Sequence, residues 1–185
     1  MELFLASKSP RRKELLTKYG FTFTAITADF NEISGANPAV VCEENAIGKS
    51  VAVYNSLGNK KAVVLGSDTV VYFNGQILGK PKDKAEAKRM LTMLSGQTHQ
   101  VYTGYSLIKF DDSVSGYFVS KVTFNTLSQQ IIEQYVESGL PLDKAGAYGI
   151  QDNFNIVDKI EGSFNNVMGL PIEKIDDIIR EFLHD

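Results

Sequence analysis

Two adjacent arginines follow a serine- and proline-containing segment close to the N-terminus, SKSPRR over residues 7–12. Ser9 suits the N-cap of a helix and Pro10 its first position. Cations in a first helical turn oppose the helix dipole, and a bound polyanion would remove that penalty. Free backbone N–H groups at a helix start bind anions, and arginine contacts phosphate in a bidentate manner. The segment therefore indicates a phosphate site, and the alternative is a solvated basic helix start.

Asp68 is a second candidate, because it follows the apolar run of residues 62–65 within the segment GSDT. We expect strands over residues 62–66 and 70–73, which places Asp68 at a strand end. Carboxylates in this position of α/β proteins often bind metal or take part in catalysis. The alternative is a turn residue that makes only local hydrogen bonds.

Two later segments could contact the rest of a nucleotide. Lys80 follows a predicted hairpin and could reach a phosphate, although its surroundings do not match a P-loop. The segment DKAGAYGIQ over residues 143–151 contains two glycines, which allow either close approach to a ligand or tight packing. Gln151 at its end offers both a donor and an acceptor, which suits the edge of a base.

The elements that must position these residues alternate between apolar strands and amphipathic helices, which predicts an α/β fold. We expect the strands over residues 2–6, 21–27, 62–66, 70–73, 76–78, 98–110 and 116–126. We expect the helices over residues 10–19, 39–57, 83–94, 128–138 and 171–183. Turns at residues 74–75 and 111–113 make hairpins of neighbouring strands. The long hairpin over residues 98–126 argues against a Rossmann fold.

Composition excludes several other classes of protein. The chain has 185 residues, enough for one domain with a full core, and a net charge of −3 that argues against broad binding to nucleic acid or membrane surfaces. The single cysteine and two histidines exclude disulfides and Cys- or His-based metal sites. His99 is expected to be a hydrogen-bonded structural histidine. With no membrane span and no signal-peptide pattern, we expect a cytoplasmic protein.

Several segments, taken together, resemble the Maf family of nucleoside triphosphate pyrophosphatases. They occur in the family's order as LASKSPRRKELL, GSDTVV, GKPKDKAEAKRMLTMLSGQTHQVYTG, PLDKAGAYGIQD and EGSFNNVMGLP. The resemblance covers nearly the whole chain and points to the subgroup that hydrolyses dTTP and UTP. It implies one domain over residues 1–185, with a long twisted mixed sheet, flanking helices and two lobes around a central cleft. That architecture is related to the inosine triphosphatases.

The resemblance also implies roles for single residues. Asp68 matches the proton acceptor, and Glu32 with Asp68 would hold a divalent cation, Mg²⁺ or Mn²⁺. The positions that match phosphate-binding residues are Ser7, Ser9, Arg11, Arg12, Lys49 and Lys80. Positions tied to base preference are Arg11, Thr69 and Gln151. The chain departs from the commoner pattern at Leu140, where glutamate often stands, and at Asp152, where glycine often stands.

The implied reaction is attack of water at the α-phosphorus of a pyrimidine nucleoside triphosphate, giving the monophosphate and pyrophosphate. The substrates would be dTTP, UTP or modified pyrimidine nucleotides. A homodimer is plausible from related folds. The alternative function is a nucleotide-binding regulator of cell division that uses the same pocket without turnover. The presence together of a carboxylate base, a candidate metal ligand and a phosphate cradle argues against that alternative, since a pure sensor would not need Asp68.

Overall fold

The computed structural model describes residues 1–58, 61–110 and 112–184. A mixed seven-stranded sheet forms its centre, with strand order β2-β1-β3-β5-β6-β7 and β4 added to β3. The parallel part contains β1 (Glu2–Leu5), β2 (Phe23–Ala25) and β3 (Ala62–Phe73). The antiparallel part contains β4 (Gln76–Leu78), β5 (Thr98–Lys109), β6 (Asp112–Phe124) and β7 (Val157–Glu161). The predicted α/β class with a mixed sheet is confirmed.

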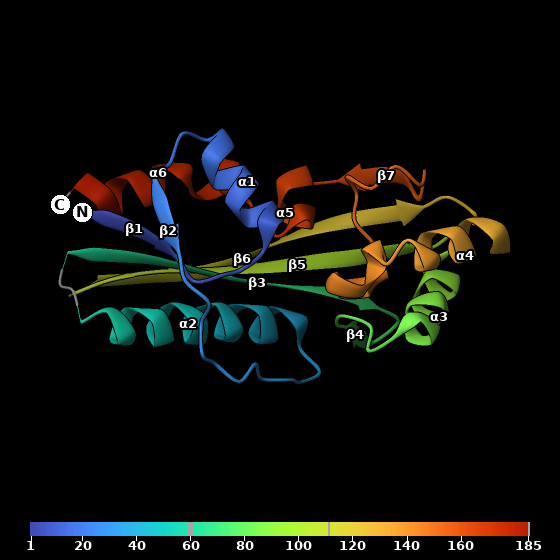
Figure 1. Cartoon of the computed structure of the whole chain (residues 1–185), viewed down its shortest axis with the longest axis horizontal. Coiled ribbons are helices and arrows are strands. Elements are labelled where there is room, and N and C mark those ends of the chain that lie inside the picture. The colour runs from blue at the N-terminus through green and yellow to red at the C-terminus, as the bar shows by residue number, and fades with distance from the viewer. Residues whose placement is uncertain (59–60, 111, 185) are drawn as a thin grey trace.

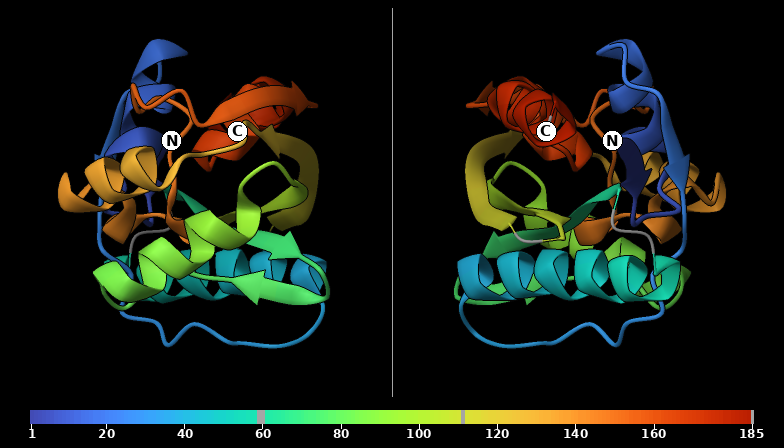
Figure 2. Two further views of the ribbon diagram at one scale, coloured as in Figure 1. Left: turned by 90° about the vertical axis from the view of Figure 1, so that its right-hand side faces the viewer. Right: turned by 90° about the vertical axis from the view of Figure 1, so that its left-hand side faces the viewer.

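The helices flank this sheet on both faces and at one end. Helix α2 (Pro38–Leu57) packs against β3 and β5 on one face. On the other face lie α1 (Pro10–Lys18), α5 (Phe164–Met168) and α6 (Ile172–His184), and the view along the long axis separates these layers (Figure 2). Helices α3 (Lys84–Leu94) and α4 (Gln129–Glu137) lie at the end of the long strands that is opposite the two chain termini (Figure 1). Two short 3-10 helices follow, η1 (Leu140–Asp143) and η2 (Ala145–Ala147).

The two largest of four hydrophobic clusters among the described residues occupy the two ends of the long strands. One includes Val71, Leu91 and Tyr135 and joins β3 to α3 and α4. The other includes Leu16 and Ile175 and joins β1 and β3 to α1 and α6. Burial of such apolar side chains supplies the main driving force for folding. The separate cores give the fold two lobes that share the same strands.

The predicted break in the strand over residues 67–69 is wrong, because β3 runs without interruption from Ala62 to Phe73. Asp68 therefore lies in the middle of a strand and not at its end. A Cβ atom on Gly66 would lie 2.1 Å from the backbone oxygen of Ala46, so glycine is needed here for close packing of α2. The buried Ser67 donates a hydrogen bond to Gly169 O at 3.0 Å. Gly66 and Ser67, whose residue types are common in turns, thus pack against α2 and Gly169 within an extended strand.

Most other predicted elements are present, with ends that differ by one or two residues. Strand β6 begins earlier than predicted, at Asp112, so residues 112 and 113 belong to the strand, and residue 111 of the predicted turn lies outside the described residues. Asp83 and Ser128 cap their helices as expected. Ser9 stands at the N-cap of α1, but its side chain makes no capping hydrogen bond within the described part of the chain. Among the described residues, the helices are all too short or too polar to cross a membrane.

Candidate active site

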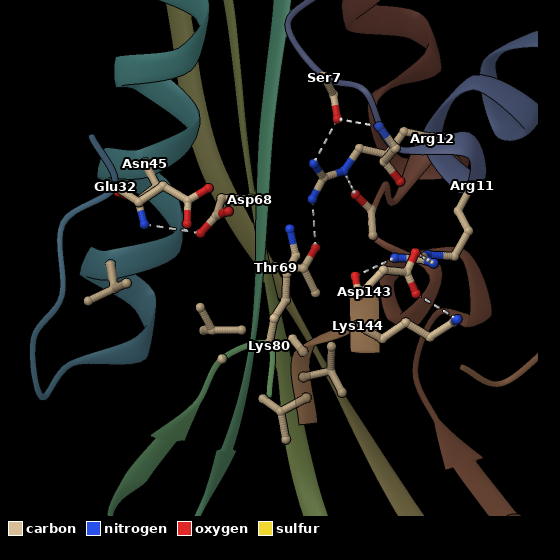
Figure 3. Close-up of a pocket in the computed structure, with 18 of the residues that line it drawn as sticks. Ser7, Arg11, Arg12, Glu32, Asn45, Asp68, Thr69, Lys80, Asp143 and Lys144 are labelled. Atoms are coloured by element: carbon tan, nitrogen blue, oxygen red, sulfur yellow. Dashed lines mark hydrogen bonds and ion pairs between the residues drawn. The ribbon is translucent and has the colours of Figure 1, made fainter. Parts of the chain in front are cut away.

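A cleft of about 1120 Å³ lies beside the middle of β3, between the two lobes. The structure brings every sequence-predicted site residue to its lining, although these residues come from six different segments. The lining includes Ser7, Ser9, Arg11, Arg12, Glu32, Lys49, Asp68, Thr69, Lys80 and Gln151. Figure 3 shows that side chains from α2, β3 and the start of α1 face the same space. The structure thus brings these positions together in one cleft, and their roles stay predictions.

The cleft is positively charged within a chain whose net charge is −3. Six basic residues and three carboxylates are among its described lining residues. The basic ones are Lys8, Arg11, Arg12, Lys49, Lys80 and Lys144. The acidic ones are Glu32, Asp68 and Asp143. An excess of cations in a concave site attracts and holds a polyanion.

The Arg12 guanidinium is held at one wall of the cleft by three hydrogen bonds. Its Nε donates to Gly169 O at 2.7 Å, and its two terminal nitrogens donate to Ser7 Oγ and Thr69 Oγ1, both at 3.1 Å. Burial lowers the pKa of Arg12, and the charge of Asp68 opposes this effect. Arginine nevertheless stays charged in proteins, so this wall carries a fixed, oriented cation.

The same contacts place Thr69 beside Arg12. Its hydroxyl accepts from Arg12 and also forms a hydrogen bond with Thr103 Oγ1 at 3.0 Å. Thr103 in turn lies 2.8 Å from Asn166 O, to which it donates. Since that bond uses the Thr103 hydrogen, Thr69 donates its own hydrogen to Thr103. The structure therefore links Thr69 to a phosphate-binding candidate, in addition to the base preference that the sequence implies.

On the opposite wall, Lys49 joins two carboxylates. Its Nζ lies 2.6 Å from Asp68 Oδ1 and 2.6 Å from Glu32 Oε1. Burial alone would raise the pKa of Glu32, but the hydrogen bond and charge of Lys49, with smaller contributions from Lys80 and Arg12, lower it overall. Asp68 lies in the floor of the cleft and is only 7% exposed. The wall thus presents one buried and one half-exposed carboxylate around a single ammonium group.

These carboxylates fit a divalent cation, provided that other ligands complete the site. Two carboxylate oxygens already face one cationic group, the Lys49 ammonium. Mg²⁺ prefers oxygen ligands and is commonly held by one or two carboxylates together with substrate phosphates. Among the described residues, no cluster of three or more His, Cys, Asp or Glu side chains could hold a metal without such help. Glu32 and Asp68 are the two carboxylates that suit a metal shared with a bound phosphate.

A second ionic network closes the other side of the cleft. Arg11 lies 3.1 Å from Asp143 Oδ2 and so connects the start of α1 to the end of η1. Lys144 donates to Asp143 Oδ1 at 2.8 Å and lies 3.5 Å from Asp152 Oδ2. Burial would raise the pKa of Asp143, but Lys144 and Arg11 outweigh it and lower the pKa. Arg11 therefore lies beside the segment that carries Gln151.

The segment around Gln151 is fixed by its own contacts. Tyr135 Oη donates to Asp152 Oδ2 at 2.5 Å and accepts from the Gly149 N–H at 2.9 Å. A Cβ on Gly149 would lie 2.9 Å from the Gln151 amide nitrogen, so that side chain lies close against the Gly149 backbone. Gly146 has φ +69° and packs against Val71. Gly146 therefore serves tight packing, one of the two alternatives left open by the sequence.

The cleft residues that sequence reasoning missed include three with polar contacts at the site, Asn45, Asp143 and Lys144. Asp143 and Lys144 stand inside a segment that was singled out for its glycines, and their adjacent opposite charges were the available signal. Asn45 donates to Asp68 Oδ2 at 3.1 Å from α2. Nothing around Asn45 in the sequence marks it, because its partners lie 12 and 23 residues away.

Comparison with known proteins agrees with this arrangement. The family model described as Maf-like protein matches residues 2–182. The dTTP/UTP pyrophosphatase of Aliivibrio fischeri is 45% identical, covering 98% of this chain and 98% of its own length. That of Bacillus anthracis is also 45% identical, with 98% and 95% covered.

Solved structures show the same fold at much lower identity. The Staphylococcus aureus Ham1 protein has a TM-score of 0.57 and 16% identity, covering 98% of this chain and 99% of that one. A HAM1 protein from Coxiella burnetii has a TM-score of 0.56 and 15% identity, with the same coverage. These likenesses concern the fold alone, whereas the family model and the relatives at 45% identity extend over nearly the whole sequence. The chain therefore belongs to the Maf family.

Proposed function

We propose that this chain is a nucleoside triphosphate pyrophosphatase that hydrolyses dTTP and UTP to the monophosphate and pyrophosphate. The observation that carries the proposal is the cleft itself, which is lined by six basic residues and the buried carboxylate of Asp68 in a chain of net negative charge. Proteins named dTTP/UTP pyrophosphatase that are 45% identical over nearly the full length support the same activity.

The basic residues bind and orient the triphosphate. Arg12 is already held by three hydrogen bonds, so little side-chain ordering is needed when substrate arrives. Lys80 extends the positive surface along the cleft, and the Lys49 ammonium lies beside it between Glu32 and Asp68. Ser9 lines the same cleft at the start of α1, where its hydroxyl makes no capping hydrogen bond within the described part of the chain. Cationic groups placed before the reaction stabilise the charge that develops on the phosphoryl oxygens. Catalysis of this kind relies mainly on positioning and electrostatics.

Asp68 accepts the proton of the attacking water. The water oxygen forms a bond to the α-phosphorus, the bond from that phosphorus to the α–β bridging oxygen breaks, and pyrophosphate leaves with that oxygen. The proton goes to the Asp68 carboxylate, which Lys49 holds through Oδ1. Glu32 and Asp68 would hold Mg²⁺ or Mn²⁺ together with substrate phosphate, and the metal would neutralise phosphate charge.

Gln151 reads the uracil or thymine edge. Its amide offers one donor and one acceptor face, and Arg11 lies on a network that reaches the same segment. A site that hydrogen-bonds its substrate rejects a mispaired one strongly, because its buried polar groups are then left without partners. Pyrimidine nucleotides whose modification lies elsewhere on the base keep the edge that Gln151 contacts, so they would bind in the same way.

The test is a panel of kcat/KM values for UTP, dTTP, CTP and GTP, each with Mg²⁺ and with Mn²⁺. We expect UTP and dTTP to be preferred, and Gln151→Ala to lose most of that preference while still hydrolysing UTP. Gln129→Ala is the control, because Gln129 lies on α4, is not among the described cleft residues and donates a hydrogen bond to Glu133 at 2.9 Å. Equal kcat/KM for all four nucleotides would contradict the selectivity and leave the reaction class standing.

A further inference from the structure

Asn45 is a buried amide in the middle of α2 that faces the cleft. It is 2% exposed, whereas asparagine in a helix usually points to solvent or caps an end. A buried amide costs free energy unless its donors and acceptor all find partners. The partners of Asn45 therefore show what the residue does in this position.

Those partners are Asp68 and the backbone of Ile33. The Oδ1 atom accepts from the Ile33 N–H at 2.8 Å. The Nδ2 atom donates to Ile33 O at 3.3 Å and to Asp68 Oδ2 at 3.1 Å. Because the Ile33 N–H can only be accepted by Oδ1, the amide cannot turn around, and Nδ2 must face the carboxylate.

This amide completes the support of the Asp68 carboxylate. Lys49 holds Oδ1 at 2.6 Å and Asn45 holds Oδ2 at 3.1 Å, so both oxygens are fixed by residues one helical turn apart on α2 (Figure 3 shows Asn45 beside Asp68). Ile33 directly follows Glu32, so the same amide also ties the segment that carries the second carboxylate to α2.

Building on the function proposed above, we propose that Asn45 is a positioning residue for catalysis, which orients Asp68 toward the attacking water and fixes the segment that carries Glu32. Hydrogen bonds to a carboxylate select one orientation of its plane, and a general base needs that geometry before its proton affinity matters. Asn45 thereby acts on turnover more than on the affinity for the triphosphate, which the arginines and lysines supply.

A purely structural role for Asn45 predicts a different result. Such a role would make the amide only a tether between α2 and the segment before it, so its loss would lower the melting temperature without a specific effect on kcat. Ser50 is a matched control, since it lies on α2, is fully buried and shares a hydrogen bond with Ser106. Ser50→Ala removes a buried hydrogen bond from the same helix without touching Asp68.

The experiment compares the full chain with Asn45→Leu, Asn45→Asp and Ser50→Ala. Leucine removes all three hydrogen bonds and keeps the branched skeleton of four side-chain heavy atoms. Aspartate has the same shape and keeps the acceptor for the Ile33 N–H, but it removes the donor to Asp68. For each protein we would measure kcat and KM for UTP with Mg²⁺, the Kd for UTP in EDTA by calorimetry, and the melting temperature.

We expect kcat to fall roughly 10- to 100-fold in both Asn45 variants, the range typical when a residue that orients an active-site ligand is lost. The Kd for UTP in EDTA should stay within about threefold of the wild-type value in Asn45→Leu, which adds no charge to the cleft, and Ser50→Ala should keep the wild-type kcat. If Asn45→Leu does not fold, the isosteric Asn45→Asp carries the test. A wild-type kcat in Asn45→Asp would overturn the role of Asn45 alone. A wild-type chain that releases no pyrophosphate would overturn the proposed function and this inference with it.

Discussion

Replacing Arg12 by lysine keeps the charge of the side chain and removes its geometry. The guanidinium spans three acceptors that lie in different directions: Gly169 O, Ser7 Oγ and Thr69 Oγ1. A lysine ammonium is compact and ends a flexible stem, so we expect it to keep about one of these contacts. The variant therefore tests whether a positive charge at this wall of the cleft supports hydrolysis without the geometry of the guanidinium.

The size of the effect follows from the two contacts that are lost. A hydrogen bond from a charged donor contributes about 1.5–3 kcal/mol. The lower end applies here, because Ser7 Oγ keeps a bond from Ser9 N and Thr69 keeps Thr103. The loss is then about 3 kcal/mol, or roughly a 100-fold fall in kcat/KM if most of it falls on the transition state.

The assay is pyrophosphate release from UTP under subsaturating conditions, with the melting temperature measured alongside. Arg180→Lys is the matched control, since Arg180 also donates to a backbone oxygen, Tyr19 O at 3.1 Å, but lies outside the cleft. We expect the control to keep kcat/KM and the Arg12 variant to lose about 100-fold. A value for Arg12→Lys within a few-fold of wild type would refute the role given to the guanidinium geometry.

Three further predictions follow from other contacts. Asp68→Asn should fold and lose about 10²- to 10⁴-fold in kcat, as expected when a general base is removed; near-normal turnover in a rapid-quench assay would show that Asp68 is not the base. Burial lowers the pKa of His99 to about 4, below its value in the unfolded chain, so its contribution to stability is present at neutral pH and lost as the pH falls from about 6.5 to about 4. Urea unfolding should show a loss over that interval that is up to about 3 kcal/mol larger for wild type than for His99→Gln, and parallel curves would exclude this cause. Gly66→Ala should destabilise the fold by at least about 1–3 kcal/mol in the same assay, because the new Cβ would lie 2.1 Å from Ala46 O; unchanged stability would mean that α2 can move away at little cost.

The sequence predicted most elements of the fold because their signals are local. Apolar periodicity, the Asn74-Gly75 turn and the caps at Asp83 and Ser128 all act within a few residues, and the structure contains each of them. The break over residues 67–69 was predicted wrongly because Gly66-Ser67-Asp68 has the composition of a turn. What keeps this stretch extended is the close approach of α2, which no local pattern reveals.

The candidate site likewise contains residues that local motifs predicted and residues that only long-range contacts reveal. Residues within recognisable motifs, such as Arg12 and Asp68, were found before the structure, and they line one cleft. Asn45 was not found, because its importance arises from contacts with Ile33 and Asp68 that form only when the chain folds. The link between Arg11 and Asp143 spans 132 residues and is equally invisible in sequence.

The most direct test of the central claim is hydrolysis of UTP in ¹⁸O-labelled water, with the products separated and their masses measured. Attack at the α-phosphorus predicts UMP that carries one labelled oxygen, together with unlabelled pyrophosphate. Label in the pyrophosphate would place the attack at the β-phosphorus, and UDP with labelled orthophosphate would place it at the γ-phosphorus. Either result would contradict the position given to Asp68, and the absence of any turnover would favour the nucleotide-binding regulator.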